Sequence, residues 1–208
     1  MGTPAVGEPV RELCAVLPRS AGAVIEDDRI RCAWAESTPD YRVYHDLEWG
    51  VVLRGDDALF ERVSLEAFQS GLSWLTILRK RDGFRTAFAQ FRIEAVAAFG
   101  DSDVARLMAD AGIVRNRAKI RATIGNARAA LDLPNGLSDL LWSFAPDPTP
   151  PRPATLAGVP ATSVESLAIA KELKRRGFSF VGPTTAYALM QATGMVDDHV
   201  ADCWRAEK

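Results

Sequence analysis

Apolar residues recur every three or four positions along most of this 208-residue chain. Leu59, Phe60 and Val63 follow this spacing, and Asp56 or Asp57 just before them can supply the N-cap of a helix. No segment shows the alternation of apolar and polar residues that is typical of strands, and no internal repeat is present. The sequence therefore predicts an all-α protein.

Further segments have the same periodicity and are bounded by residues that begin or end helices. Ser102 begins one helix with Gly112 as its C-cap, Ser163 begins a second that Gly177 ends, and Pro183 fits the first turn of a third. The segment of residues 31–50, rich in Trp and Tyr, is expected to be irregular. Other helices are expected at residues 74–81 (interrupted by Asp82–Gly83), 84–91, 93–99, 117–131 and from Asp197 or Asp198 onward.

We expect residues 1–28 to form a loosely ordered extension and residues 29–208 to form one domain of two helical lobes. The Pro-rich segment of residues 145–160 is the expected surface loop between the lobes. The chain shows neither a signal peptide nor an apolar run long enough to span a membrane. We therefore expect a monomeric, cytoplasmic, bacterial protein with reduced thiols, Cys14 being a free one.

Charge gives an ambiguous indication about nucleic acids. The net charge of −2 weighs against a nucleic-acid partner, because phosphate binding usually leaves a basic footprint. Basic residues nevertheless gather at residues 79–92 and 115–128. Either stretch could bind DNA or could be an ordinary solvated helix face.

The two histidines of the chain, His45 and His199, each lie near a cysteine. Cys32 precedes His45 by 13 positions, and Cys203 follows His199 by four, a spacing that places both side chains on one face of a helix. Two thiolates and two imidazoles form a closed tetrahedral set that suits structural zinc. Such a site would join the N- and C-terminal segments. The alternative is two buried cysteines and two hydrogen-bonded histidines.

A second group of residues could bind a flat ligand. Glu66 shares a helix face with Leu59 and Val63, so its carboxylate should point toward the apolar side, where it needs a donor. That donor is either a ligand or Arg62, four residues earlier. Aromatic residues that are close in sequence surround this position, and they form either a pocket or a plain core: Trp34, Tyr41, Tyr44, Trp49 and Trp74.

A tight turn between two predicted helices could hold a phosphate. Backbone N–H groups from Gly112 to the start of the next helix, aided by the helix dipole, can bind a DNA backbone. Arg115, Arg117 and Lys119 lie close by. Helical hairpins are common, so this feature alone is weak.

Short segments between about residue 30 and residue 204 resemble one known family. They are residues 31–34 (RCAW), 44–50 (YHDLEWG), 65–66 (LE), 71–74 (GLSW), 110–113 (DAGI), 124–128 (IGNAR), 142–144 (WSF), 174–178 (KRRGF), 180–182 (FVG) and 198–200 (DHV). Together they resemble the DNA-3-methyladenine glycosylase I family, a branch of the helix-hairpin-helix DNA glycosylases.

The resemblance implies a two-lobed helical glycosylase that flips N3-methyladenine out of double-stranded alkylated DNA and releases it by hydrolysis of the N-glycosyl bond. It implies a base-reading and catalytic carboxylate at Glu66, stacking rings at Tyr44 and Trp74, and a DNA wedge at Leu72. It further implies pocket walls at Trp34, Tyr41 and Trp49 and zinc ligands at Cys32, His45, His199 and Cys203.

Two features depart from the wider superfamily. Residues 115–117 (RNR) stand where its hairpin more often has glycine, and Asp132 and Asp139 are unconvincing matches for its catalytic aspartate. The resemblance leaves open which group activates water. The alternatives from other classes are a non-catalytic, zinc-stabilised helical DNA-binding module and a helical interaction protein whose aromatics are core.

Overall fold

The computed structural model describes residues 27–207, and every regular element within that range is a helix, which confirms the predicted all-α class. No helix there is long and apolar enough to cross a bilayer. The α-helices are α1 (Pro39–Leu47), α2 (Asp56–Gln69), α3 (Trp74–Ala87), α4 (Ile93–Ala97), α5 (Asp101–Ala109), α6 (Arg117–Leu131), α7 (Gly136–Trp142), α8 (Val164–Arg175) and α9 (Pro183–Ala192). Short 3₁₀ helices lie at Ala33–Ser37, Ala89–Phe91, Leu156–Gly158 and Trp204–Glu207.

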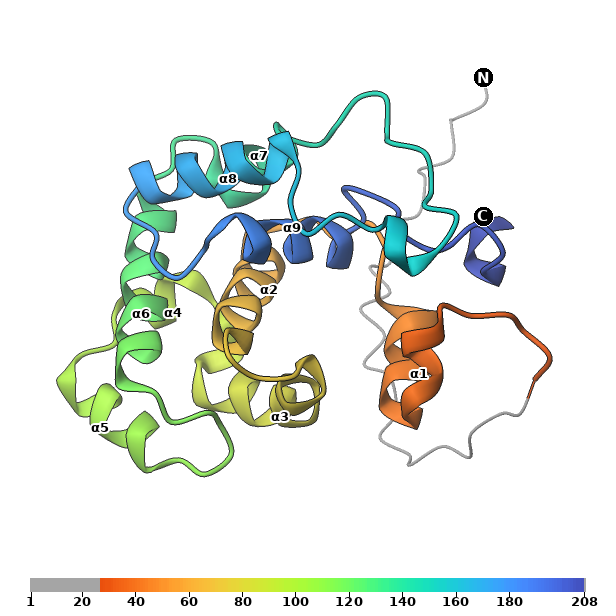
Figure 1. Cartoon of the computed structure of the whole chain (residues 1–208). Helices are drawn as coiled ribbons and strands as arrows, with labels where there is room; N and C mark the ends of the chain where they lie inside the picture. Colours follow the sequence, from red (N-terminus) through yellow and green to blue (C-terminus); the bar gives the residue numbers. More distant parts are fainter. Residues whose placement is uncertain (1–26, 208) are drawn as a thin grey trace, which may run out of the picture.

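Helix α2 lies in the middle of the molecule and packs against α3, α6, α7 and α9 (Figure 1). A helix in that position must be apolar on nearly all sides. Leu59, Phe60, Leu65 and Phe68 are accordingly fully buried. The ring of Phe68 packs against those of Phe84 and Phe88, at the end of α3. The carboxylate of Glu66 is thus carried by the most enclosed helix of the fold.

Segments from the two ends of the described chain lie side by side. The backbone N–H of Trp204 donates to the carbonyl of Ile30 at 2.8 Å. Helix α1 and the C-terminal segment lie on the same side of the molecule, as Figure 1 shows. The backbone N–H of Leu53 donates to the carbonyl of Thr193 at 3.1 Å, which fixes the α1–α2 connection against the end of α9.

Several predicted boundaries are confirmed. Ser163 caps α8, and its side chain accepts a hydrogen bond from the backbone N–H of Ser166. Pro183 begins α9.

Other predicted boundaries differ from the structure. Helix α5 begins at Asp101 rather than Ser102, and it ends at Ala109, so Gly112 is not its C-cap. The predicted extension at residues 1–28 lies almost wholly outside the described residues.

The expectation of an irregular segment at residues 31–50 is wrong. Thr38 caps α1 by accepting a hydrogen bond from the backbone N–H of Tyr41, and Pro39 occupies the first turn. The apolar spacing fails to indicate this helix because Val43 and Leu47 are exposed whereas Tyr44 is buried. Helix α7 was also not predicted. The predicted helix from Asp197 or Asp198 is absent, and the chain there is irregular up to Trp204.

The predicted break at Asp82–Gly83 is also wrong, because α3 continues through it to Ala87. Gly83 serves close packing. A Cβ atom there would lie 2.5 Å from the backbone oxygen of Gly112, in the α5–α6 connection. That connection can approach α3 only because residue 83 has no side chain.

Replacing Gly83 with Ala should lower stability, although Ala favours a helix by about 1 kcal/mol over Gly. The clash with the backbone of Gly112 must push the α5–α6 connection away from α3, and overpacking of this kind costs about 1–3 kcal/mol. Thermal unfolding should show a lower Tm for Gly83→Ala. Gly125→Ala in α6 is the matched control, since a Cβ there meets nothing within 4 Å. It should raise the Tm or leave it unchanged, and an equal fall in both variants would contradict the packing argument.

Candidate functional site

A pocket of about 470 Å³ opens between α1, α2, the start of α3, α9 and the segment around Leu156. Glu66 and all five aromatic residues predicted around it line this pocket. The structure therefore brings together residues 34, 41, 44, 49, 66 and 74, as the prediction required. The sequence analysis missed the residues that complete the wall from distant parts of the chain: Gln69, Leu156, Val159, Ala188, Gln191, Ala192 and Asp198.

The aromatic side chains form a connected wall. The rings of Tyr44 and Trp74 lie 5.5 Å apart at 47°, and Trp34 meets Trp49 edge-on at 5.1 Å. The hydroxyl of Tyr41 accepts a hydrogen bond from the backbone N–H of Leu75 at 2.9 Å, which ties α1 to the start of α3. Because these rings border a cavity, the alternative of a plain aromatic core is wrong.

Glu66 and Asp198 are the acidic residues that line this pocket, and only 5% of the surface of Glu66 is exposed. Burial raises the pKa of its carboxyl to about 7, and the positive charge of Arg62 only partly opposes this effect. No hydrogen bond or ion pair to the Glu66 carboxylate is found among residues 27–207. The guanidinium of Arg62 instead donates to the Tyr44 hydroxyl at 3.2 Å and lies 3.8 Å from the Glu48 carboxylate. The alternative in which Arg62 pairs with Glu66 is therefore wrong.

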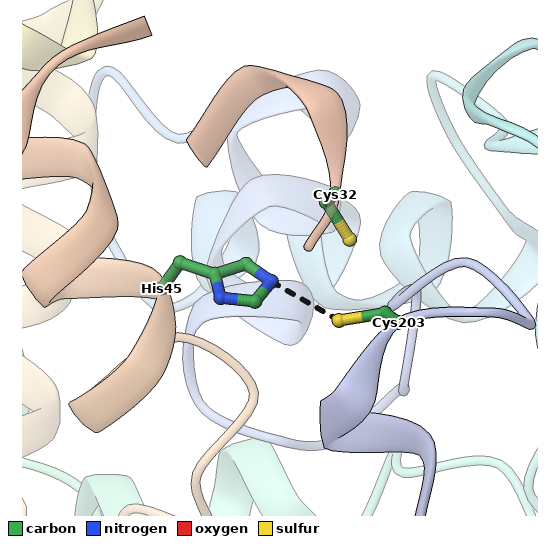
Figure 2. A group of neighbouring side chains, drawn as sticks. All are labelled: Cys32, His45 and Cys203. Atoms are coloured by element: carbon green, nitrogen blue, oxygen red, sulfur yellow. Dashed lines mark hydrogen bonds between the residues drawn. The ribbon is translucent and has the colours of Figure 1, made fainter. Parts of the chain in front are cut away.

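Cys32, His45 and Cys203 form a buried group whose ligand atoms all lie within 4.8 Å of one another (Figure 2). His45 Nε2 lies 3.4 Å from Cys203 Sγ. The ring of His199 is 5.0 Å from that of His45, and its Nε2 atom is buried without a hydrogen-bond partner in the described part of the chain. Two thiol sulfurs and one imidazole nitrogen thus converge, and such a donor set can hold a metal ion. His199, the fourth predicted ligand, lies beside His45 but outside this group.

The route by which His199 and Cys203 come together differs from the predicted one. They do not share a helix face, because residues 198–203 form an irregular turn in which the backbone N–H of Cys203 donates to the carbonyl of Val200. Gly50 allows the close approach of His199. Its φ is +74°, and a Cβ atom would lie 2.7 Å from the His199 ring.

The residues predicted to contact DNA fall into two groups. Arg115 and Arg117 are exposed in the α5–α6 connection and at the start of α6. Leu72 is 41% exposed, and in the sequence it lies between Gln69 and Trp74, which both line the pocket. The backbone N–H of Gly112, in contrast, already donates to the Asp110 carboxylate at 2.7 Å. That N–H group is therefore engaged within the protein.

Lys119 does not fit the predicted phosphate contact, because its side chain is buried. Its ammonium group donates to the backbone oxygens of Phe68 and Ser70, at 2.9 and 2.7 Å. Burial lowers the pKa of this lysine. Lys119 thus holds the end of α2 and the start of the loop that carries Leu72. It thereby connects the start of α6 to the end of α2, next to the pocket residue Gln69.

Comparisons with known proteins agree on one family. The model of the methyladenine glycosylase family matches residues 34–206. The chain is 48% identical over 177 residues to DNA-3-methyladenine glycosylase 1 of Escherichia coli, covering 83% of this chain and 95% of that protein. It is 42% identical over 177 residues to DNA-3-methyladenine glycosylase of Haemophilus influenzae, covering 83% of this chain and 96% of that protein.

Solved structures give the same result. A crystal structure of 3-methyladenine DNA glycosylase I superposes with a TM-score of 0.80 at 44% identity, covering 84% of this chain and 98% of that one. A structure of the Staphylococcus aureus enzyme, described as showing the basis of 3-methyladenine recognition, superposes with a TM-score of 0.81 at 34% identity. It covers 86% of this chain and 97% of that one.

Replacing Lys119 with Met should destabilise the protein by about 2–3 kcal/mol, because two backbone carbonyl groups lose their donor. Urea unfolding measures this change. Lys171→Met is the control, since Lys171 is exposed on α8, and it should change stability by less than about 0.5 kcal/mol. Equal stability of the two variants would show that the buried ammonium group contributes nothing.

Proposed function

The chain belongs to the methyladenine glycosylase family, and from this premise we propose that it is a base excision repair enzyme that removes N3-methyladenine from double-stranded alkylated DNA. It hydrolyses the N-glycosyl bond and releases free 3-methyladenine. The observation that carries the proposal is the buried Glu66 carboxylate, without a partner in the described chain, in an aromatic pocket. A charged carboxylate in such a place needs a ligand that supplies both hydrogen-bond donors and positive charge.

N3-methylated adenine meets both requirements. Methylation makes the base a cation, so its flat ring is attracted to the faces of aromatic side chains. Stacking on Tyr44 and Trp74 would contribute about 1–3 kcal/mol per base contact. The N–H groups of the base can donate to Glu66, which favours the carboxylate form and selects the cation over neutral adenine. Specificity then lies in the charge and shape of the base rather than in the DNA sequence.

The reaction follows from the charge of the leaving group. When the bond between C1′ and the base nitrogen breaks, its electron pair passes to the cationic base, which leaves as a neutral molecule. Water adds to C1′ and loses a proton to solvent. Because the leaving group is already activated, the protein's tasks are access, orientation and stabilisation of positive charge. We assign the last of these to Glu66, as the catalytic carboxylate.

Access to the base requires it to leave the duplex, at a cost of a few kcal/mol. Leu72 is exposed in the loop between α2 and α3 and would fill the gap in the base stack. Arg115 and Arg117 are exposed and can contact phosphates, which would position the duplex without reading its sequence.

We propose further that Cys32, His45, His199 and Cys203 hold a structural zinc ion. The buried group of Cys32, His45 and Cys203 supports this assignment, as does the buried Nε2 of His199, which has no hydrogen-bond partner in the described chain. When bound, the ion would cross-link segments that are more than 150 residues apart and would leave no position for substrate. The two-lobed architecture, the monomeric state and the cytoplasmic location stay predictions.

The sequence alone is also compatible with a DNA-binding module and with a helical interaction protein, and the pocket argues against both. A non-catalytic DNA-binding module would leave the buried charge of Glu66 unexplained, and a helical interaction protein would need no such pocket. The decisive assay is release of 3-methyladenine from alkylated duplex DNA by the purified chain. Absence of release, with DNA binding intact, would replace the enzyme by the binding module.

Glu66→Gln should slow excision and weaken binding of free 3-methyladenine by about 10- to 100-fold, because a hydrogen bond to a charged group contributes about 1.5–3 kcal/mol. Single-turnover excision and a binding titration measure both effects. Glu94→Gln, an exposed carboxylate on α4, is the control and should behave as the wild type. Unchanged excision and binding in Glu66→Gln would remove this carboxylate from the mechanism.

Glu66 should also make stability depend on pH. Its pKa is about 7 when folded, against an ordinary value of 4.5, so the unfolded chain ionises first as the pH rises. The free energy of unfolding of the wild type therefore falls as the pH rises from about 4.5 to about 7, and this loss is constant above that range. The free energy of unfolding of Glu66→Gln, measured relative to Glu94→Gln, should therefore rise by about 2 kcal/mol between pH values of about 5.5 and about 8. A constant difference in urea unfolding across that range would mean that the pKa of Glu66 is not raised.

A further inference from the structure

Both histidines of the metal site are held by a carboxylate that is itself held by an arginine. His45 Nδ1 lies 2.9 Å from the Asp46 carboxylate, which accepts a hydrogen bond from Arg31 Nε at 2.9 Å. His199 Nδ1 lies 2.7 Å from the Asp197 carboxylate, which accepts from Arg152 Nε at 2.8 Å. In each case the arrangement fixes the ring and leaves Nε2 for the metal.

The two Arg–Asp–His hydrogen-bond chains differ in the segments of the protein that their arginines connect. Arg31 and Asp46 lie within the segment that carries Cys32 and His45. Arg152 instead belongs to the Pro-rich connection between α7 and α8, which supplies Leu156 and Val159 to the pocket. Its guanidinium also donates to the backbone oxygen of Arg205 at 3.2 Å.

A second bond fastens the same connection to the turn that carries His199 and Cys203. The backbone N–H of Ala201 donates to the carbonyl of Pro153 at 3.1 Å. Residues 152 and 153, which lie four and three positions before Leu156, are therefore docked on that turn. Displacement of either partner would move a wall of the pocket.

The opposite side of the metal site also borders the pocket. Trp49 lines the pocket, and its ring lies 4.6 Å from that of His199 and 6.3 Å from that of His45. Asp198, adjacent to His199, lines the pocket as well, and its carboxylate accepts a hydrogen bond from the Tyr187 hydroxyl at 2.8 Å. The metal site and the pocket thus share side chains and backbone.

We propose that Arg152 is a positioning residue that couples the metal site to the base pocket, because its bond to Asp197 orients His199 and holds the Leu156–Val159 wall in place. The metal site then does more than fasten the two chain ends, since its integrity sets the affinity of the pocket for the base. This inference rests on the proposed function and on the proposed zinc ligands.

The test compares zinc-loaded, full-length wild type with Arg152→Leu and Arg152→Lys. The first measurement is the rate at which zinc passes to a colorimetric chelator. Loss of a residue that supports a histidine ligand typically weakens metal binding by about 10- to 100-fold. Arg152→Leu should therefore release zinc at least about tenfold faster, and Arg152→Lys should be intermediate, because lysine keeps the charge but not the planar fork.

The second measurement is the Kd for free 3-methyladenine with zinc in excess. It should rise about three- to tenfold in Arg152→Leu, as part of the apolar wall is lost, and Arg152→Lys should again be intermediate. Arg175→Leu is the control, because Arg175 pairs only with Glu172 on the exposed side of α8, and it should change neither quantity.

The possible results distinguish failure of the coupling through Arg152 from failure of the proposed function. Wild-type zinc release in Arg152→Leu, or faster release with an unchanged Kd, would overturn the coupling. Failure of the wild-type chain itself to bind 3-methyladenine would overturn the proposed function, and zinc release would still report on the Arg152–Asp197–His199 relay. Thermal unfolding of each variant shows whether it is folded, and Arg152→Lys provides the folded comparison if Arg152→Leu is not.

Discussion

The meeting of the two chain ends is the constraint on which the rest of this structure depends. Ile30 bonds to Trp204, and Cys32 and His45 face His199 and Cys203. The same meeting brings α1 against α2 and α3, so that the rings of α1 become a wall of the pocket. Closing a loop of this length costs chain entropy, and the proposed metal site would offset part of that cost.

The pocket carries an energetic conflict that fits its proposed use. A carboxylate at position 66 is enclosed by α2 and by aromatic rings, and burial, only partly opposed by the charge of Arg62, raises its pKa to about 7. An apolar residue there would favour folding. In the free protein this group lowers stability, and in the proposed function a cationic base supplies its missing partner. Stability is thus lower at a position where binding requires a carboxylate.

Some charged residues of this fold are buried and bind other parts of the protein instead of facing solvent. Lys119, expected at the DNA, instead binds the end of α2, and Arg62, one of two candidate donors to Glu66, binds Tyr44 and Glu48. Both outcomes have the same physical origin. A long side chain can reach several partners, and its choice depends on which backbone oxygens or carboxylates the tertiary structure leaves without a donor.

The sequence by itself determined the helical class, the aromatic cluster around Glu66 and the candidate metal ligands, because periodicity, residue type and short spacing are local properties. Only the tertiary structure decided that residues 156–159 and 188–198 complete the pocket, that α3 passes unbroken through Gly83, and that His199 and Cys203 meet on an irregular turn. These outcomes depend on contacts between segments far apart in the chain. Local patterns carry no information about such contacts until the backbone brings the segments together.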